Sequence, residues 1–177
     1  MSFLRNVVVV GGGTGFIGTY VCRSLRNKNF LPKIISRMPG ANHITWQDLE
    51  EKGLPEGTVA VINVAGQNVM DVSKRWTTGF KQNVWNSRVR TTAALTQAII
   101  NATKKPKAFV SISGVGIYKP SPSVEYAEDY NGAEFDYFSK LCIEWEKAAK
   151  LPGNLIECRQ ITIRSGVVLG KDGGMIK

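Results

Sequence analysis

The sequence predicts an α/β fold in which helices cover both faces of a doubly wound parallel sheet. Short β-branched segments alternate with longer segments of helical periodicity, which is typical of βαβ units. The first strand segment, NVVVV at 6–10, is apolar without alternation, as expected for a strand that is buried on both faces. A glycine-rich turn follows this segment directly and leads into a predicted helix.

Apolar side chains at helical spacing predict three helices. They run over about 15–28, 78–101 and 135–150. The last of them has the clearest apolar side, made of Phe138, Leu141, Cys142, Trp145 and Ala149.

The other predicted strands are short apolar runs between these helices. A stretch rich in proline, glycine and acidic residues at 119–133 is expected to be a loop. The strand segments lie at 33–36, 43–46, 59–66, 107–113 and within 155–163.

Length and composition indicate one globular domain over residues 1–177. The chain is 43% hydrophobic and 21% charged, and no apolar run approaches the ~20 residues of a membrane span. No signal or long transit peptide is recognisable, so an intracellular, most simply cytoplasmic, location is expected. The three cysteines are far apart and form no CxxC motif, which predicts reduced thiols and no metal site.

The formal net charge of +9 is high for 177 residues. Nucleic-acid binding is one explanation, but the basic residues are scattered and the densest run is only KKPK at 104–107. An anionic small ligand and a solvated basic surface explain the charge equally well. We therefore expect a small-molecule substrate and neither a nucleic-acid nor a membrane partner; the oligomeric state stays open.

The turn at 11–18 has the spacing of a phosphate-binding loop. It reads GGGTGFIG and matches G-x-G-x-x-G at its third, fifth and eighth residues. Glycines allow a tight turn and a close approach of backbone N–H groups to a pyrophosphate, at the positive end of a helix dipole. The turn predicts dinucleotide binding by a Rossmann-type domain, with these candidate residues: Gly12, Gly13, Thr14, Gly15, Phe16, Ile17 and Gly18.

The second strand ends in Ser36 and Arg37, about twenty residues after the last glycine of the turn. Enzymes that prefer NAD usually have an acidic residue here, which binds the ribose 2′-hydroxyl. A hydroxyl and a guanidinium instead suit a 2′-phosphate. The pair predicts NADP(H) as cofactor, and the alternative is a surface arginine with no ligand.

Taken in order, these motifs resemble the extended short-chain dehydrogenase/reductase superfamily, which is also described as the NAD-dependent epimerase/dehydratase superfamily. The resemblance covers essentially all 177 residues, and within the superfamily the chain is similar to an atypical "epimerase family protein" branch of NADP-dependent oxidoreductases. The superfamily motifs are GGGTGFIG, NVAG (63–66), SISGVGIY (111–118), SK (139–140) and RSGVVLG (164–170). The branch is indicated by SR (36–37), RW (75–76), SRV (87–89) and WE (145–146).

The resemblance implies further cofactor contacts. Val64, Ala65 and Gly66 would line the adenine and ribose side, although a strand can also simply end in small residues. Arg88 takes the place of the usual active-site Asn and would hold a phosphate or a substrate anion, or be a plain exposed helix residue. Asn83, earlier on the same predicted helix, is another candidate for the cofactor.

The resemblance also implies catalytic positions near the end of the fifth strand. Ser113 matches the catalytic Ser and would polarise a substrate carbonyl, unless it only bonds its own loop. Ser111 lies on the same strand face and is counted with the cofactor residues. Tyr118 would supply a phenol donor or pack in the loop.

The usual Tyr and Lys of the superfamily are separated by four residues, about 40° apart on a helix. Lys140 is present, but Asp136 occupies the Tyr position and Tyr137 lies one residue too late. An irregular helix start could bring Tyr137 into the site, and Asp136, Tyr118 or the acidic residues of 125–134 could supply another donor. The simplest alternative is an Asp136–Lys140 surface pair.

Two functions therefore remain open. The first is an NADP(H)-dependent oxidoreductase or epimerase-like enzyme, acting on a small carbonyl or sugar-like substrate with a non-standard Tyr position. The second is a non-catalytic NADPH-binding sensor or partner-binding protein. Superfamily members carry substrate contacts in a C-terminal domain, and we expect this chain to be truncated before it, so the substrate is not predicted.

Overall fold

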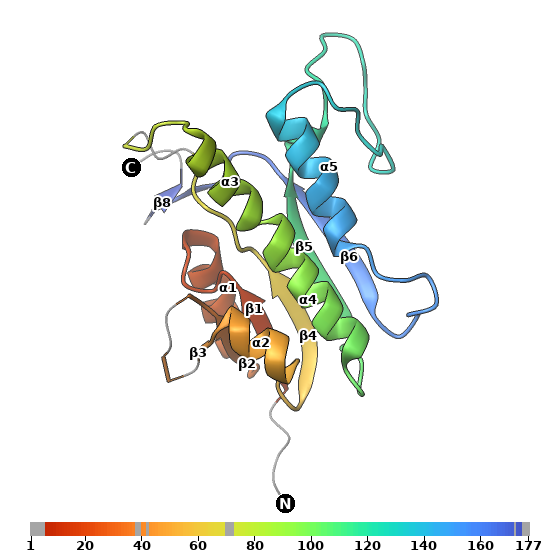
Figure 1. The fold of residues 1–177 in the computed structure, drawn as a ribbon. Helices are drawn as coiled ribbons and strands as arrows, with labels where there is room; N and C mark the ends of the chain where they lie inside the picture. Colours follow the sequence, from red (N-terminus) through yellow and green to blue (C-terminus); the bar gives the residue numbers. More distant parts are fainter. Residues whose placement is uncertain (1–5, 38–39, 42, 70–72, 172, 175–177) are drawn as a thin grey trace, which may run out of the picture.

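The computed structural model describes residues 6–37, 40–41, 43–69, 73–171 and 173–174. Its main sheet has six parallel strands in the order β3-β2-β1-β4-β5-β6 (Figure 1). The strands are β1 (Val7–Gly11), β2 (Leu31–Ile35), β3 (His43–Ile44), β4 (Thr58–Asn63), β5 (Ala108–Gly114) and β6 (Arg159–Ser165).

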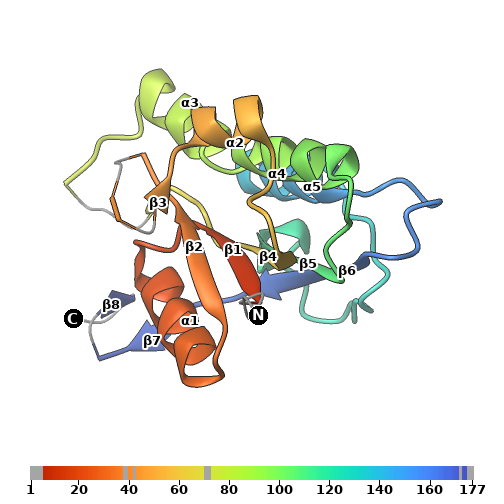
Figure 2. The same cartoon turned by 90° about the horizontal axis from the view of Figure 1, so that it is seen from below.

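Helices lie on both faces of this sheet. Figure 2 shows α2, α3, α4 and α5 over one face, while α1 and the small β7–β8 hairpin lie on the other. The doubly wound Rossmann-type fold is thereby confirmed. The bounds are α1 (Phe16–Asn27), α2 (Trp46–Lys52), α3 (Thr78–Asn86), α4 (Val89–Asn101), the 3₁₀ turn η1 (Val115–Ile117), α5 (Tyr137–Ala149), β7 (Leu169–Gly170) and β8 (Gly173–Gly174).

Alternate side chains of β1 belong to two different cores, which explains its unbroken apolar sequence. Val7 and Val9 pack in a cluster with Leu95 of α4. Val8 and Val10 pack on the opposite face with Cys22 of α1 and with residues of β2. All four valines are buried, so a polar residue at any of these positions would be placed in an apolar core.

The prediction of one long helix over 78–101 is wrong. The chain forms α3 and α4, with Ser87 as the C-cap of the first helix. The Ser87 hydroxyl donates to the Val84 carbonyl oxygen at 2.9 Å and accepts from the Gln67 N–H at 2.9 Å. The break ties the loop after β4 to the helix layer, and neither glycine nor proline marks it in the sequence.

Helix α2 was not predicted, and the strand expected at 43–46 is only two residues long. Thr45 instead caps α2. Its side chain accepts from the Asp48 N–H at 2.9 Å, and its own N–H donates to the Asp48 carboxylate at 3.0 Å. This reciprocal pair is a capping box, and it sets the start of a helix that is too short to show periodicity.

All three cysteines are free and buried. Within the described ranges, no helix is both long enough and apolar enough to cross a membrane. The same ranges contain no group of three or more His, Cys, Asp and Glu side chains that could bind a metal ion.

Candidate functional site

A cleft of about 690 Å³ opens where β1, β2 and β4 end. β1 pairs with β2 on one side and with β4 on the other, so the chain winds outward in both directions from this point. Ligands of open α/β sheets bind at such a switch point, outside the carboxyl ends of the strands. The cleft is lined by Gly12, Thr14, Gly15, Ile35, Ser36, Arg37, Trp46, Glu50, Val64, Ala65, Gly66, Gln67, Asn68, Asn83, Asn86, Ser87, Arg90, Thr91 and Ala94.

The turn between β1 and α1 is close to the loop after β4, and it leaves no room for side chains at two glycines. Gly12 has φ +76°, and a Cβ there would lie 2.6 Å from the Ala65 Cα. A Cβ on Gly18 would overlap the Gly12 carbonyl oxygen, and the Gly15 N–H donates to that oxygen at 3.0 Å. Glycine is therefore required by backbone packing on both sides of the turn.

Helix α1 begins without a side-chain cap. Gly15 is its N-cap and makes no side-chain capping hydrogen bond to the amides that open the helix. The amide N–H groups that open a helix lack intrahelical partners, and they lie at the positive end of its dipole. Because Thr14 and Gly15 line the cleft, this end of α1 can receive an anion.

The predicted turn residues divide into two groups. Gly12, Thr14 and Gly15 line the cleft, while Gly13, Phe16, Ile17 and Gly18 do not. Gly13 packs against Ile34, where an added Cβ would lie 2.8 Å from the side chain. The Phe16 ring lies against Gly170 and Gly173 of the β7–β8 hairpin. Its side chain therefore points to the sheet face that α1 and this hairpin cover (Figure 2), and away from the cleft.

Basic side chains occur at two places on the cleft wall. Arg37 follows β2, where it was expected, and Arg90 lies on α4. Neither guanidinium has a hydrogen bond or ion pair with another residue in the described part of the chain. Ser36 is buried beside Arg37 and also lines the cleft.

The loop Val64–Gly66 lines the cleft as expected, and a buried polar chain holds it in place. The Asn63 side chain accepts from the Ala65 N–H at 3.1 Å and donates to the Thr92 hydroxyl at 2.7 Å. Trp145 donates its indole N–H to the same hydroxyl at 2.9 Å. Helices α4 and α5 therefore fix the loop through side chains that are fully or almost fully buried.

Arg88 lies behind the cleft wall and does not line it. Its guanidinium donates to the Gln67 carbonyl oxygen at 3.0 Å and to the Val84 carbonyl oxygen at 3.2 Å, and it lies 5.2 Å from the centre of the Trp145 ring. Burial lowers its pKa from the ordinary arginine value. Arg88 thus holds the loop in place, whereas the candidate Asn83 does line the cleft.

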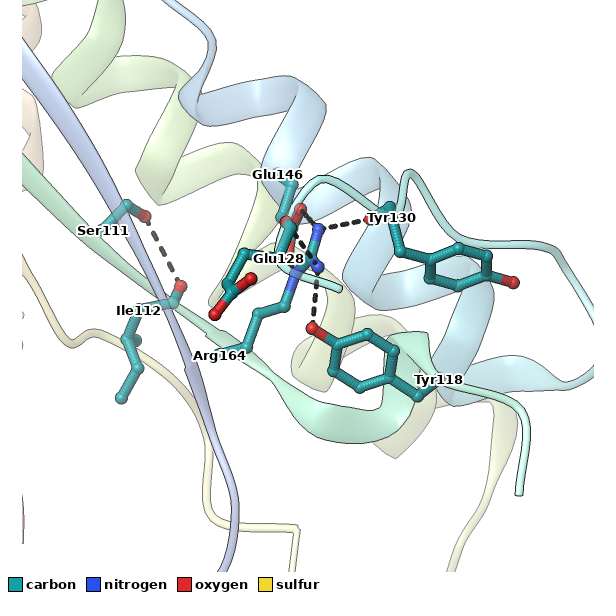
Figure 3. A network of polar contacts seen from close by, with 7 residues as sticks. All are labelled: Ser111, Ile112, Tyr118, Glu128, Tyr130, Glu146 and Arg164. Carbon is teal, nitrogen blue, oxygen red and sulfur yellow. Dashed lines mark hydrogen bonds and ion pairs between the residues drawn. The ribbon is translucent and has the colours of Figure 1, made fainter. Parts of the chain in front are cut away.

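Ser111 and Ser113 are buried on the face of β5 that carries Phe109, and neither lines the cleft. Ser111 donates to the Ile112 carbonyl oxygen at 3.4 Å (Figure 3). The Ser113 hydroxyl has no hydrogen bond of good geometry with a described residue. It lies beside Cys142, whose pKa is raised by burial, while the Gly114 backbone and the Ser113 hydroxyl act in the opposite direction.

Asp136 is the N-cap of α5. Its carboxylate accepts from the Ser139 N–H at 2.7 Å, and its own N–H donates to the Ser139 hydroxyl at 2.9 Å. Lys140 is paired with Glu134, at 3.5 Å between Nζ and Oε2, and its side chain is 54% exposed. The alternative of an Asp136–Lys140 surface pair is therefore wrong, because Asp136 caps α5 and Lys140 pairs with Glu134.

Tyr137 is the first residue of α5, and its phenol reaches α3. The hydroxyl donates to the Lys81 carbonyl oxygen at 2.7 Å. The ring contacts Trp76 and Phe138 edge-on, with centroid distances of 6.0 and 5.5 Å. Burial raises the pKa of Tyr137, and Arg88 opposes this only in part. A phenol in this state is a weak acid at neutral pH.

Tyr118 lies in a network centred on Arg164 of β6 (Figure 3). Arg164 donates to both carboxylate oxygens of Glu146 at 2.9 Å, and to the Tyr118 hydroxyl at 2.8 Å. It also donates to the carbonyl oxygens of Glu128 at 3.1 Å and Tyr130 at 2.7 Å. The network joins the loop at 119–133 to the sheet edge, and no sequence pattern predicted it.

Comparison with known proteins identifies the class of domain that this fold and cleft define. Residues 8–149 match the model of the "NAD dependent epimerase/dehydratase family". The match spans more than half of the chain, and the chain belongs to this family.

The relatives of the chain include the epimerase family protein SDR39U1. The protein from Bos taurus is 47% identical over 169 residues, which are 96% of this chain and 56% of the relative. A crystal structure of the human SDR39U1 protein (isoform 2) with NADPH superposes with a TM-score of 0.89 at 46% identity, over 95% of this chain and 56% of that one. This chain thus spans little more than half the length of these relatives.

A more distant structure shares the fold alone. The nucleoside-diphosphate sugar epimerase from Corynebacterium glutamicum superposes with a TM-score of 0.75 at 23% identity. The superposition covers 97% of this chain and 36% of that one.

Proposed function

We propose that residues 1–177 form an NADP-binding Rossmann domain, and that the protein is an NADP(H)-dependent oxidoreductase or epimerase-like enzyme. The substrate that we propose is a small carbonyl or sugar-like molecule. The observation that carries the proposal is the cleft itself, where a glycine turn and an uncapped helix face Arg37, an arginine with no partner among the described residues. A relative at 46% identity that was crystallised with NADPH supports the choice of cofactor.

The residues of the cleft fit the chemical groups of this cofactor. Close packing at Gly12 leaves only backbone beside the turn, so a pyrophosphate can approach the amides at the start of α1. Arg37, which lines the cleft, would bind a 2′-phosphate, and the Val64–Gly66 loop would line the adenosine. When bound, NADP(H) supplies or accepts a hydride at its nicotinamide ring.

The candidate catalytic side chains require rearrangement before they can act on a substrate. Tyr137 can donate a proton only after its hydroxyl leaves the Lys81 carbonyl oxygen. The Ser113 hydroxyl has no hydrogen bond of good geometry with a described residue and could bond a carbonyl, but the side chain is buried. Lys140 is half exposed and would hold a phenolate or a ribose once it is released from Glu134.

A second candidate is a non-catalytic NADPH-binding sensor or partner-binding protein. The bonds of Asp136, Tyr137 and Tyr118 favour it, because each of these groups already has a structural partner. Turnover of NADPH with a panel of small carbonyl compounds separates the two candidates. NADPH binding without turnover of any member would favour the sensor.

Titration with NADPH and NADH tests the proposed cofactor. We expect the protein to prefer NADPH, and Arg37→Ala to weaken NADPH binding by about ten- to a hundred-fold, since a charge-assisted bond is worth about 1.5–3 kcal/mol. Arg159→Ala is the control, because Arg159 is exposed at the opposite end of the sheet. Equal affinity for the two nucleotides would overturn the choice of NADP(H).

The free and buried state of all three cysteines supports an intracellular location. The compartment is part of the proposal, and fractionation of cells that express the protein would test it. Recovery from an oxidising compartment would contradict it.

A further inference from the structure

The cleft contains two residues on α2 that none of the predicted contacts use. Trp46 and Glu50 both line it, and they are four residues apart on one side of the helix. We propose that this pair recognises the base of the dinucleotide, with the Trp46 ring as an apolar wall and the Glu50 carboxylate accepting from the 6-amino group of adenine. This inference rests on the proposed function and adds the base specificity of the same site.

The position of the base follows from the positions proposed for the phosphates. The pyrophosphate is assigned to the turn at Gly12–Gly15, and the 2′-phosphate to Arg37. The base is attached to the ribose that carries the 2′-phosphate, so it must lie in the part of the cleft beyond Arg37. We assign to this part five residues that line the cleft: Ile35, Trp46, Glu50, Val64 and Ala94.

Trp46 lines the cleft and is anchored by its contacts with the core. It is half-buried and packs against the main core. Its ring reaches the end of β1, because a Cβ built on Gly11 would lie 3.3 Å from the Trp46 Cη2. The indole offers a flat apolar surface in the cleft that Ala94 also lines, and aromatic surfaces of this kind bind nucleobases.

Glu50 differs from the other two acidic residues of α2, Asp48 and Glu51, in having no partner among the described residues. Asp48 is bonded to Thr45 and Lys52, and Glu51 accepts from Gln47 at 2.8 Å. No hydrogen bond or ion pair joins Glu50 to any residue that the structure describes. An ionised carboxylate only accepts hydrogen bonds, and the adenine 6-amino group donates them.

The chemistry predicts rejection of a base that lacks this donor. Hypoxanthine carries a carbonyl oxygen in place of the amino group, so it would face the Glu50 carboxylate with an acceptor. A site that is built around one hydrogen bond discriminates strongly against an analogue that cannot form it. The expected preference for NADPH over reduced nicotinamide hypoxanthine dinucleotide phosphate is about ten- to a hundred-fold.

Titration of the purified protein with these two dinucleotides tests the inference. Glu50→Gln should reduce the preference to about threefold or less, because an amide can donate to the hypoxanthine oxygen as well as accept from adenine. Glu50→Gln also removes a negative charge near the phosphates, and this changes the affinities for both dinucleotides by the same factor. The ratio of the two affinities is therefore insensitive to the change of charge. Glu51→Gln is the matched control, since Glu51 lies on the same helix but does not line the cleft, and it should leave the preference unchanged.

Each outcome bears on a defined part of the inference. Equal affinity of the unchanged protein for the two dinucleotides overturns base recognition by this pair, and so does a preference that survives Glu50→Gln. If NADPH is still preferred over NADH in those cases, the proposed function stands. Failure to bind any of the three nucleotides overturns the inference and the proposed function together.

Discussion

The two halves of the sheet differ in whether their polar groups are bonded to other parts of the chain. At the ends of β1, β2 and β4, the α1 amides, Arg37, Arg90 and Glu50 face a cleft without protein partners in the described structure. Around β5 and β6, Tyr137, Asp136 and Tyr118 are each bonded to another part of the chain.

This difference in hydrogen bonding indicates which half of the sheet can bind a ligand without rearrangement. Groups without partners in a preformed cleft can bind a ligand with little reorganisation, whereas groups in structural bonds must first break them. The first half can therefore bind an anionic ligand with little rearrangement, in agreement with the dinucleotide site that we propose. The second half holds a loop and a helix N-terminus in place, and catalysis there would require a change of conformation.

The largest effect is expected at the glycine turn of the first half. Gly12→Ala should lower the free energy of unfolding by about 2–5 kcal/mol, because the position has positive φ and a Cβ meets the Ala65 backbone. NADPH binding should be lost as well. Urea unfolding and nucleotide titration measure the two effects.

Gly79 provides the control for this substitution. It lies in α3, and a Cβ there would have no neighbour within 4 Å. Gly79→Ala should therefore be neutral or stabilise the protein by about 0.5–1 kcal/mol. Equal effects of the two substitutions would mean that the turn is not tightly packed.

In the second half, the largest effect is expected at Arg164. Arg164→Ala leaves Glu146 unpaired although its side chain is only 20% exposed, and it releases the carbonyl oxygens of the 119–133 loop. The expected loss is about 2–4 kcal/mol of unfolding free energy, with faster proteolysis in the loop. Urea unfolding and limited proteolysis measure these changes.

Two further variants show whether the stability depends on the geometry and burial of the Arg164 network or on charge alone. Arg164→Lys keeps the charge but loses the two-pronged bond to Glu146, so its stability should be intermediate. Lys147→Ala breaks an exposed ion pair with Glu144 and should change stability by less than about 0.5 kcal/mol. Similar losses for Lys147→Ala and Arg164→Ala would contradict a special role of the network.

Tyr137→Phe tests whether the second half has a structural or a catalytic role. Loss of the bond to the Lys81 carbonyl oxygen should lower the unfolding free energy by about 0.5–1 kcal/mol, and NADPH affinity should stay within about twofold. Parallel measurements of stability, affinity and any NADPH turnover are needed. Unchanged stability together with a large loss of turnover would show that the phenol acts as a proton donor.

The smallest effect is expected from pH. Burial raises the pKa of the Cys22, Cys142 and Cys158 thiols above the ordinary value, although Arg26 opposes the shift at Cys22. Since the thiols ionise first in the unfolded state, their contribution is complete well below pH 9 and is lost as pH rises through that range. Unfolding free energy should fall by at most about half a kcal/mol between pH 7 and 8, and more steeply above pH 9. A stability that rises with pH above 8 would contradict these shifts.

Sequence patterns predicted the sheet and the glycine turn because long-range packing agrees there with local preference. The valine run of β1 is buried on both faces, and Gly12 is required by its own backbone angle. The break between α3 and α4 was missed because it depends on Ser87 bonding to Gln67, twenty residues earlier. The same break turns Arg88 inward, while Arg90 lines the cleft.

The two cleft residues of α2, Trp46 and Glu50, were not predicted from the sequence, for a different reason. Trp46 and Glu50 belong to a seven-residue helix, whose only sequence signal is the capping pair Thr45 and Asp48. A similar signal, Asp136 followed by Ser139, marks the start of α5, and it explains why Asp136 caps a helix rather than pairing with Lys140. Local capping motifs thus held information that periodicity alone did not.

Amide hydrogen exchange with and without NADPH tests the contrast between the two halves most directly. We expect NADPH to slow exchange in the 12–18 turn and in the 64–68 loop, with smaller changes at 159–165 and at the start of α5. Protection confined to the second half, or no protection at any amide, would contradict the proposal that the glycine-turn cleft is the preformed nucleotide site.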